Sequence, residues 1–100
     1  MINTLEKGDL IGVAYNNYIH AAIYIGEGRA KNPQFYRLNT DLIEWLERGQ
    51  IPYASFINRE ARMDFYGCCP IVKVSVDCLP EEQQKLYVKI KDLLIKNRRL

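Results

Sequence analysis

The sequence has few of the residues that build metal centres and disulfide frameworks. Its 100 residues include one histidine, His20, and three cysteines, Cys68, Cys69 and Cys78. The cysteine count is odd and two cysteines are adjacent, which is untypical of a disulfide framework. No cysteine has zinc-ligand spacing relative to His20. The sequence therefore predicts no disulfide, no bound metal and no cofactor.

The sequence also lacks a long apolar segment. A helix that crosses a bilayer needs about 20 apolar residues, and no run in this chain approaches that length. The first residues, Met1–Lys7, lack the apolar core of a signal peptide. Since the cysteines are also untypical of a secreted protein, we expect a cytoplasmic protein of the reducing cytosol, with no membrane partner.

The chain has little net charge. A formal charge of +2 is too small to indicate a nucleic-acid-binding protein, which usually has a clearly basic face. Nucleic acid therefore stays a possible partner, but not the favoured one. The basic residues Lys96, Arg98 and Arg99 at the end of the sequence are typical of the negative end of a helix.

What the sequence does contain fits one small globular domain. A length of 100 residues is close to the usual size of a domain, and 48% hydrophobic residues can supply a core. No repeat, linker or change of composition divides the chain. We therefore predict a single domain over residues 1–100.

The first half of the sequence predicts a hairpin, a third strand and a short helix. Strands are expected over residues 10–15 and 18–25, joined at Asn16–Asn17, since asparagine tolerates tight turns. In the second strand alternate residues are apolar on both faces, so it should be central. A third strand is expected over residues 34–38. The helix after it should begin at Asn39 or Thr40, use Leu42, Trp45 and Leu46 as its apolar stripe, and end at Gly49.

The second half predicts two further strands and a longer helix. A short strand is expected within residues 53–57 and a last strand over residues 71–76, with alternate valines on its core face. Pro80 should lie in the first turn of the final helix. The apolar stripe expected on this helix consists of Leu86, Tyr87, Ile90, Leu93 and Leu94. The pattern predicts an α+β fold: a small antiparallel sheet or partly open SH3-like barrel of about five strands, with one short central helix and a longer C-terminal helix.

One local pattern points to a cysteine hydrolase. Residues 8–11 (Gly-Asp-Leu-Ile) and 20–28 (His-Ala-Ala-Ile-Tyr-Ile-Gly-Glu-Gly) resemble the opening of NlpC/P60-type hydrolases of the lecithin:retinol acyltransferase-like branch. The resemblance implies that Cys78 is a nucleophile before a helix and that His20 is its base. Asn32 stands where that family usually has a second histidine. The alternative reading makes His20 a strand residue and Cys78 a small apolar residue at a junction.

A longer pattern points to a binding protein. Ile23–Arg29 with its Gly-Glu-Gly-Arg turn, the Asn-Pro-Gln-Phe-Tyr-Arg-Leu segment 32–38, a short helix ending at Gly49 and the final helix after Leu79 follow in that order. This order resembles small accessory proteins of T4-like bacteriophages. The resemblance implies a protein that binds or blocks a host component, in an anti-defence or host-takeover role, without turnover. Of the two hypotheses, we favour the binder over the enzyme.

The middle of the sequence suggests what such a binder would hold. Glycines 26 and 28 let backbone N–H groups approach an anion, and neighbouring arginines and tyrosines can bind phosphate and stack on a base. We therefore expect a small anionic, nucleotide-like ligand, for which a homodimer interface is one candidate site, with a host protein as the next candidate. The expected ligand-binding residues are Arg29, Lys31, Asn32, Tyr36, Arg37, Tyr24, Arg59 and Arg62. The alternative is that these arginines belong to a solvated face.

Overall fold

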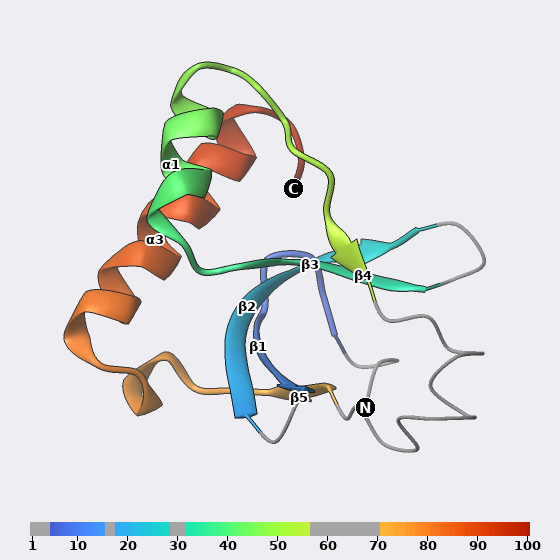
Figure 1. The fold of residues 1–100 in the computed structure, drawn as a ribbon, viewed down its shortest axis with the longest axis vertical. Coiled ribbons are helices and arrows are strands. Elements are labelled where there is room, and N and C mark those ends of the chain that lie inside the picture. The colour runs from blue at the N-terminus through green and yellow to red at the C-terminus, as the bar shows by residue number, and fades with distance from the viewer. Residues whose placement is uncertain (1–4, 16–17, 29–31, 57–70) are drawn as a thin grey trace.

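The protein folds as an antiparallel sheet with two helices packed on one of its faces (Figure 1). The computed structural model describes residues 5–15, 18–28, 32–56 and 71–100. Helix α1 (Thr40–Glu47) is short, and helix α3 (Glu81–Lys96) is twice as long. This arrangement confirms the predicted α+β class with a short central helix and a longer C-terminal helix.

The sheet is built around three strands. These are β1 (Leu10–Tyr15), β2 (Tyr18–Glu27) and β3 (Pro33–Arg37). Two much shorter strands, β4 (Ser55–Phe56) and β5 (Ile71–Lys73), pair at the edges, so that the order is β4-β3-β2-β1-β5 with every pairing antiparallel. The range of β1 is the predicted one. Strand β2 is central, as its two apolar faces indicate.

A glycine bends the central strand. The pairing of β2 with β3 shifts register between Tyr24 and Gly26, and Gly26 has a φ of 101°. A β-carbon there would lie 2.9 Å from Cε of Lys7. Glycine is therefore favoured at this bulge for its backbone and for the close approach of the lysine stem.

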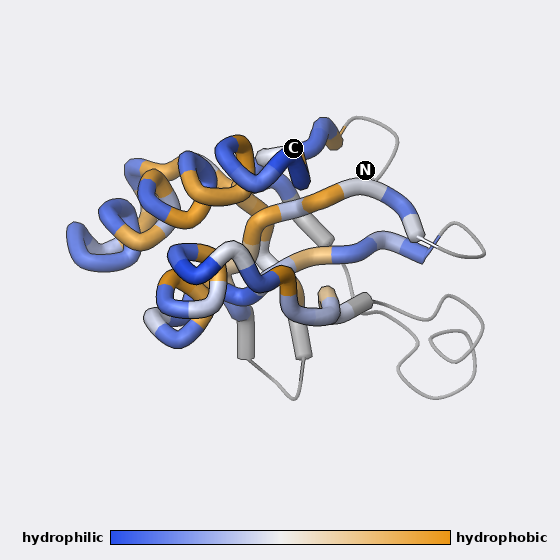
Figure 2. Tube along the Cα trace, turned by 90° about the horizontal axis from the view of Figure 1, so that it is seen from above, coloured by the Kyte–Doolittle hydropathy of each residue, from blue (hydrophilic) through white to orange (hydrophobic). Residues whose placement is uncertain are grey.

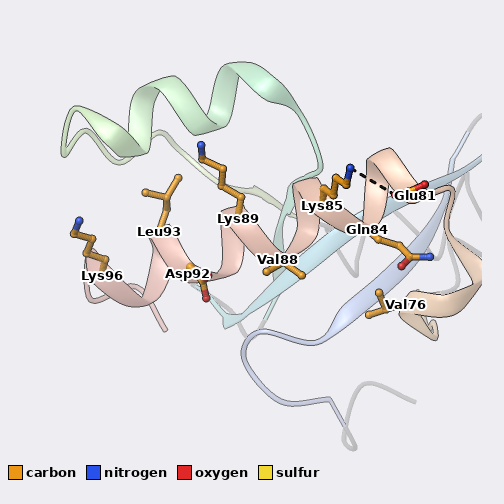
Figure 3. A pocket seen from close by; sticks show the side chains of 9 residues that line it. All are labelled: Val76, Glu81, Gln84, Lys85, Val88, Lys89, Asp92, Leu93 and Lys96. Atoms are coloured by element: carbon orange, nitrogen blue, oxygen red, sulfur yellow. Dashed lines mark ion pairs between the residues drawn. The ribbon is translucent and has the colours of Figure 1, made fainter.

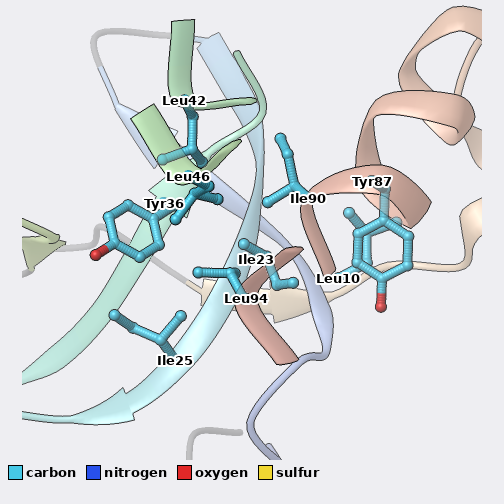
Figure 4. Packing of buried hydrophobic residues seen from close by; sticks show 9 residues of the cluster. All are labelled: Leu10, Ile23, Ile25, Tyr36, Leu42, Leu46, Tyr87, Ile90 and Leu94. Carbon is cyan, nitrogen blue, oxygen red and sulfur yellow. The ribbon is translucent and has the colours of Figure 1, made fainter. Parts of the chain in front are cut away.

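The main core lies between the sheet and the two helices (Figure 4). Alternation along β2 directs Ile23 and Ile25 toward the helices, and Tyr87, Ile90 and Leu94 of α3 cover them. Figure 2 shows the same amphipathic pattern, since hydrophobic and hydrophilic residues alternate around each helix. The buried residues of this core are Leu10, Ile23, Ile25, Tyr36, Leu42, Leu46, Tyr87, Ile90 and Leu94.

The other face of the sheet is buried as well. It carries Ala22 and Tyr24 from β2 and Phe35 from β3, with Leu5 packed against them. Ile11 and Val13 of β1 complete this second cluster. The predicted alternation of β2, with Ile23 and Ile25 on one side and Ala22 and Tyr24 on the other, is therefore confirmed.

Side-chain hydrogen bonds connect the elements at their ends. The Asn39 side chain accepts a bond from the backbone N–H of Asp41 at 2.7 Å and so caps α1. The buried Tyr87 hydroxyl donates to the carbonyl oxygen of Gly8 at 2.5 Å, which connects α3 to the turn before β1. Asn97, after α3, donates to the carbonyl oxygen of Leu46 in α1 at 3.2 Å.

Several details of the prediction were wrong. Trp45 does not belong to the buried stripe of α1, because its side chain is 48% exposed while Leu42 and Leu46 face the core. The last strand stops at Lys73 instead of continuing to residue 76. After Val74 bonds to the carbonyl oxygen of Leu10, the chain turns into the 3₁₀ helix η4 (Val76–Cys78). Pro80 precedes α3 as its N-cap residue.

Neither described helix combines the length and apolar character that a membrane crossing requires. The segment 58–65, which the sequence left unassigned, lies outside the described residues.

Candidate functional site

An exposed arginine and the only histidine of the chain form a pair on the sheet. Arg37, the last residue of β3, is aligned with Ala22 of β2, so it is a diagonal neighbour of His20 on the same face. Its Nη2 lies 3.3 Å from Nδ1 of His20. Val13 is directly opposite His20 on β1, and it belongs to the cluster on the face that lies away from the helices.

The chemistry of the Arg37–His20 contact determines which N–H donors of the two side chains remain for a ligand. A guanidinium group has N–H donors and no acceptor, so His20 Nδ1 must accept the hydrogen bond. A neutral imidazole that accepts at Nδ1 carries its proton on Nε2. The pair therefore has several unused N–H donors on Arg37 and one on His20. Together they form a donor surface that suits an anion.

No described carboxylate neutralises this pair. The ion pairs between described residues join Lys73 to Asp9, Lys85 to Glu81 and Lys89 to Glu47. Arg37 takes part in none of these pairs, and its side chain is exposed. Among the described residues, no carboxylate therefore competes with a ligand for the positive charge of Arg37.

The two tyrosines predicted to stack on a base lie in the interior. Tyr24 is 4% exposed and Tyr36 is 5% exposed, and they belong to the clusters on opposite faces of the sheet. The Tyr36 hydroxyl donates to the carbonyl oxygen of Pro52 at 2.6 Å, which is a structural role. The prediction that both rings offer stacking surfaces is therefore corrected, because their faces are covered by the protein itself.

The predicted loop residues are only partly described. Asn32 is half-buried at the start of the third strand region, and its carbonyl oxygen accepts a bond from the Gly28 N–H at 2.9 Å. Four of the predicted ligand-binding residues lie outside the described residues: Arg29, Lys31, Arg59 and Arg62. Their part in binding stays a prediction.

The structure does not bring the alternative catalytic residues together. Cys78 is exposed at the end of η4, just before α3, and α3 packs on the sheet face that carries Ile23 and Ile25. His20 alternates with those residues and shares the opposite face with Ala22. Its described partner is Arg37. A direct transfer of a proton from Cys78 to His20, which the hydrolase hypothesis requires, needs hydrogen-bond contact between them.

The described residues contain no cluster of three or more side chains that could hold a metal ion. Cys78 is a free thiol there, whereas Cys68 and Cys69 lie outside the described residues.

A shallow surface pocket lies along α3, and none of the predicted site residues lines it (Figure 3). Its volume is about 770 Å³. Val88, 54% exposed, lies on this outer surface of α3. Two lysines that line the pocket form ion pairs, Lys85 with Glu81 at 3.6 Å and Lys89 with Glu47 at 3.7 Å. The residues that line the pocket are Val76, Glu81, Gln84, Lys85, Val88, Lys89, Asp92, Leu93 and Lys96. Mixed and largely compensated charges give this surface no clear ligand preference.

Sequence reasoning named both members of the Arg37–His20 pair but assigned them to different hypotheses. The signal that could have joined them is strand register, because diagonal neighbours on one face can be found once β2 and β3 are aligned. Comparison with known protein families, with curated proteins and with solved structures finds no match to this chain.

Proposed function

We propose that this chain is a non-catalytic binding protein that sequesters a small anionic, nucleotide-like ligand. The observation that supports the proposal is the exposed Arg37 guanidinium, which donates to His20 Nδ1 at 3.3 Å and meets no described carboxylate. An arginine beside a neutral histidine presents N–H donors on two side chains, which matches the several acceptor oxygens of a phosphate.

The pair is held by the sheet rather than by a flexible segment. The residue aligned with Arg37, Ala22, is fully buried, and so is the next residue along β2, Ile23. Binding through Arg37 and His20 would therefore need little ordering of the backbone, which favours affinity. Arg29 and Lys31, which lie outside the described residues, stay predicted ligand-binding residues.

The proposed setting rests on the resemblance to accessory proteins of T4-like bacteriophages. In that setting the protein would act in the host cytoplasm, where it would remove a nucleotide-like signal or block a host component. We also propose that the sheet is the core of a partly open SH3-like barrel. Support for this comes from the short strands β4 and β5 at the two edges and from the bulge at Gly26.

Titration calorimetry with ATP, cyclic AMP and ADP-ribose, each compared with inorganic phosphate, tests the proposed function. Arg37→Ala should weaken binding at least tenfold, since it removes the main cation. His20→Asn keeps a polar side chain but does not reproduce the imidazole, so a smaller loss is expected. Lys85→Ala serves as the matched control, because Lys85 is an exposed cation of α3 that lies outside the proposed site.

Equal loss in Arg37→Ala and Lys85→Ala would show that binding follows overall charge and would refute the site. Absence of binding by all these compounds to the unaltered chain would refute the ligand class.

A further inference from the structure

The C-terminal ends of the two helices meet at one end of the molecule (Figure 1). Asn97 joins them, since its Nδ2 donates to the carbonyl oxygens of Leu93 in α3 at 2.8 Å and of Leu46 in α1 at 3.2 Å. The last turn of each helix is therefore positioned against the other. The exposed side chains near Leu46 and Asn97 therefore lie at the same end of the molecule.

Both helices end with the same pattern of backbone hydrogen bonds. In α1 the N–H of Gly49 donates to Leu46 and the N–H of Gln50 donates to Trp45. In α3 the N–H of Arg98 donates to Ile95 and that of Arg99 donates to Leu94. This is the Schellman motif, in which the first residue beyond the cap takes a left-handed conformation. The residue in that position is Gly49 in α1, with a φ of 76°, and Arg98 in α3, with a φ of 61°.

Arginine is an unfavourable choice at that position. Glycine adopts the left-handed conformation without steric cost, whereas a residue with a β-carbon pays roughly 1 kcal/mol. Arg98 is the only described residue other than glycine with a positive φ. Local backbone strain of this kind is enriched at functional sites. The guanidinium of Arg98 is therefore a candidate for such a function.

The end of the molecule around Arg98 carries exposed cations, an exposed indole and two exposed carboxylates of α1, Glu44 and Glu47, of which Glu47 is paired with Lys89. Its exposed cations are Arg48, Lys96, Arg98 and Arg99, and none forms an ion pair with a described residue. Trp45 is 48% exposed, and it precedes Arg48 by three positions, which places the two on neighbouring parts of the α1 surface. We call these five residues the helix-end surface.

We propose that the helix-end surface binds single-stranded nucleic acid. Arginines bind phosphate oxygens through paired N–H donors, and an exposed aromatic ring stacks on an unpaired base. An unpaired strand fits better than a duplex, because the bases of a duplex are stacked on one another and do not reach Trp45. This site goes beyond the proposed nucleotide site, which lies on the sheet and uses Arg37 and His20.

The chain offers a direct spectroscopic readout, because Trp45 is its only tryptophan. A twelve-nucleotide strand of deoxythymidylate should quench Trp45 fluorescence as a base stacks on the indole. In a plot of the logarithm of the binding constant against the logarithm of the salt concentration, each phosphate contact contributes a slope of about −0.7. Four contacts therefore predict roughly 50-fold weaker binding at 200 mM than at 50 mM salt.

Arg98→Gly is the decisive variant, since glycine suits the backbone of this position. It should leave the thermal midpoint unchanged or raised, yet weaken binding of the strand several-fold and make the salt slope shallower. Lys85→Ala is the matched control, because Lys85 is an exposed cation of α3 that belongs to neither proposed site, and it should bind the strand as the unaltered chain does.

Three results would overturn the proposal. One is the absence of quenching by the strand, and another is unchanged binding in Arg98→Gly. The third is equal quenching and competition by polyglutamate of similar length, which would assign the surface to an acidic protein partner instead. Loss of binding in Arg98→Gly with retained binding in Lys85→Ala would support it.

Discussion

The ends of α1 and α3 share one backbone geometry but carry different chemistry. At α1 the left-handed position is occupied by Gly49, and a β-carbon built there would meet no atom within 4 Å. At α3 the same position is occupied by Arg98. After α1, glycine adopts the left-handed conformation without steric cost. After α3, a long cationic side chain occupies the same position at some cost in stability. The same backbone position is therefore occupied without a β-carbon in one helix and with one in the other.

The two ends also depend on each other, because Asn97 connects them. Replacing Asn97 with alanine removes two side-chain hydrogen bonds, and each such bond contributes about 1 kcal/mol. We expect the free energy of unfolding of Asn97→Ala to fall by about 1–2 kcal/mol in urea denaturation.

Gln50→Ala provides the control for Asn97→Ala. Gln50 is exposed directly after Gly49, so its truncation should change stability by less than about 0.5 kcal/mol. Equal stability of the two variants would mean that Asn97 does not join the helix ends in solution.

Replacing Gly49 with arginine gives the end of α1 the residue type found at the end of α3. Gly49→Arg introduces a β-carbon at a φ of 76°, in open space. The cost should therefore come from the backbone alone, and we expect a loss of about 1 kcal/mol. Chemical denaturation measures it, with Gly49→Ala as the control that adds the β-carbon without the charge. A stable Gly49→Arg variant would show that left-handed positions in this fold carry little strain.

Much of the fold could be predicted because local signals agreed with one another. The hairpin, the two-sided burial of β2 and the Asn39 cap all follow from alternation and capping preferences within short segments. The last strand was extended too far, because the valine pattern continues past the point where Val74 makes its bond to Leu10. Pairing decides where a strand ends, and pairing is not local.

The functional residues were harder to predict, since their environment depends on distant contacts. The sequence suggested that Tyr36 is available for stacking. In the structure it is buried in the core between the sheet and the helices, and its hydroxyl donates a hydrogen bond to the carbonyl oxygen of Pro52. The contact between Arg37 and His20 requires the register of β2 and β3. The left-handed residue after α3 gave no sequence signal, because the usual glycine is absent there. Basic residues at that end were attributed to the helix dipole alone.

The smallest expected change is also the most direct test of this account. Arg98→Gly removes the β-carbon from a residue with a φ of 61°, so the free energy of unfolding should rise by about 0.5 kcal/mol or more. Urea denaturation of the unaltered chain and the variant, under identical salt, measures this difference. A higher stability for Arg98→Gly is the predicted result. A clear loss of stability would contradict the claim that the end of α3 keeps arginine at an energetic cost, and would make Arg98 a structural residue instead.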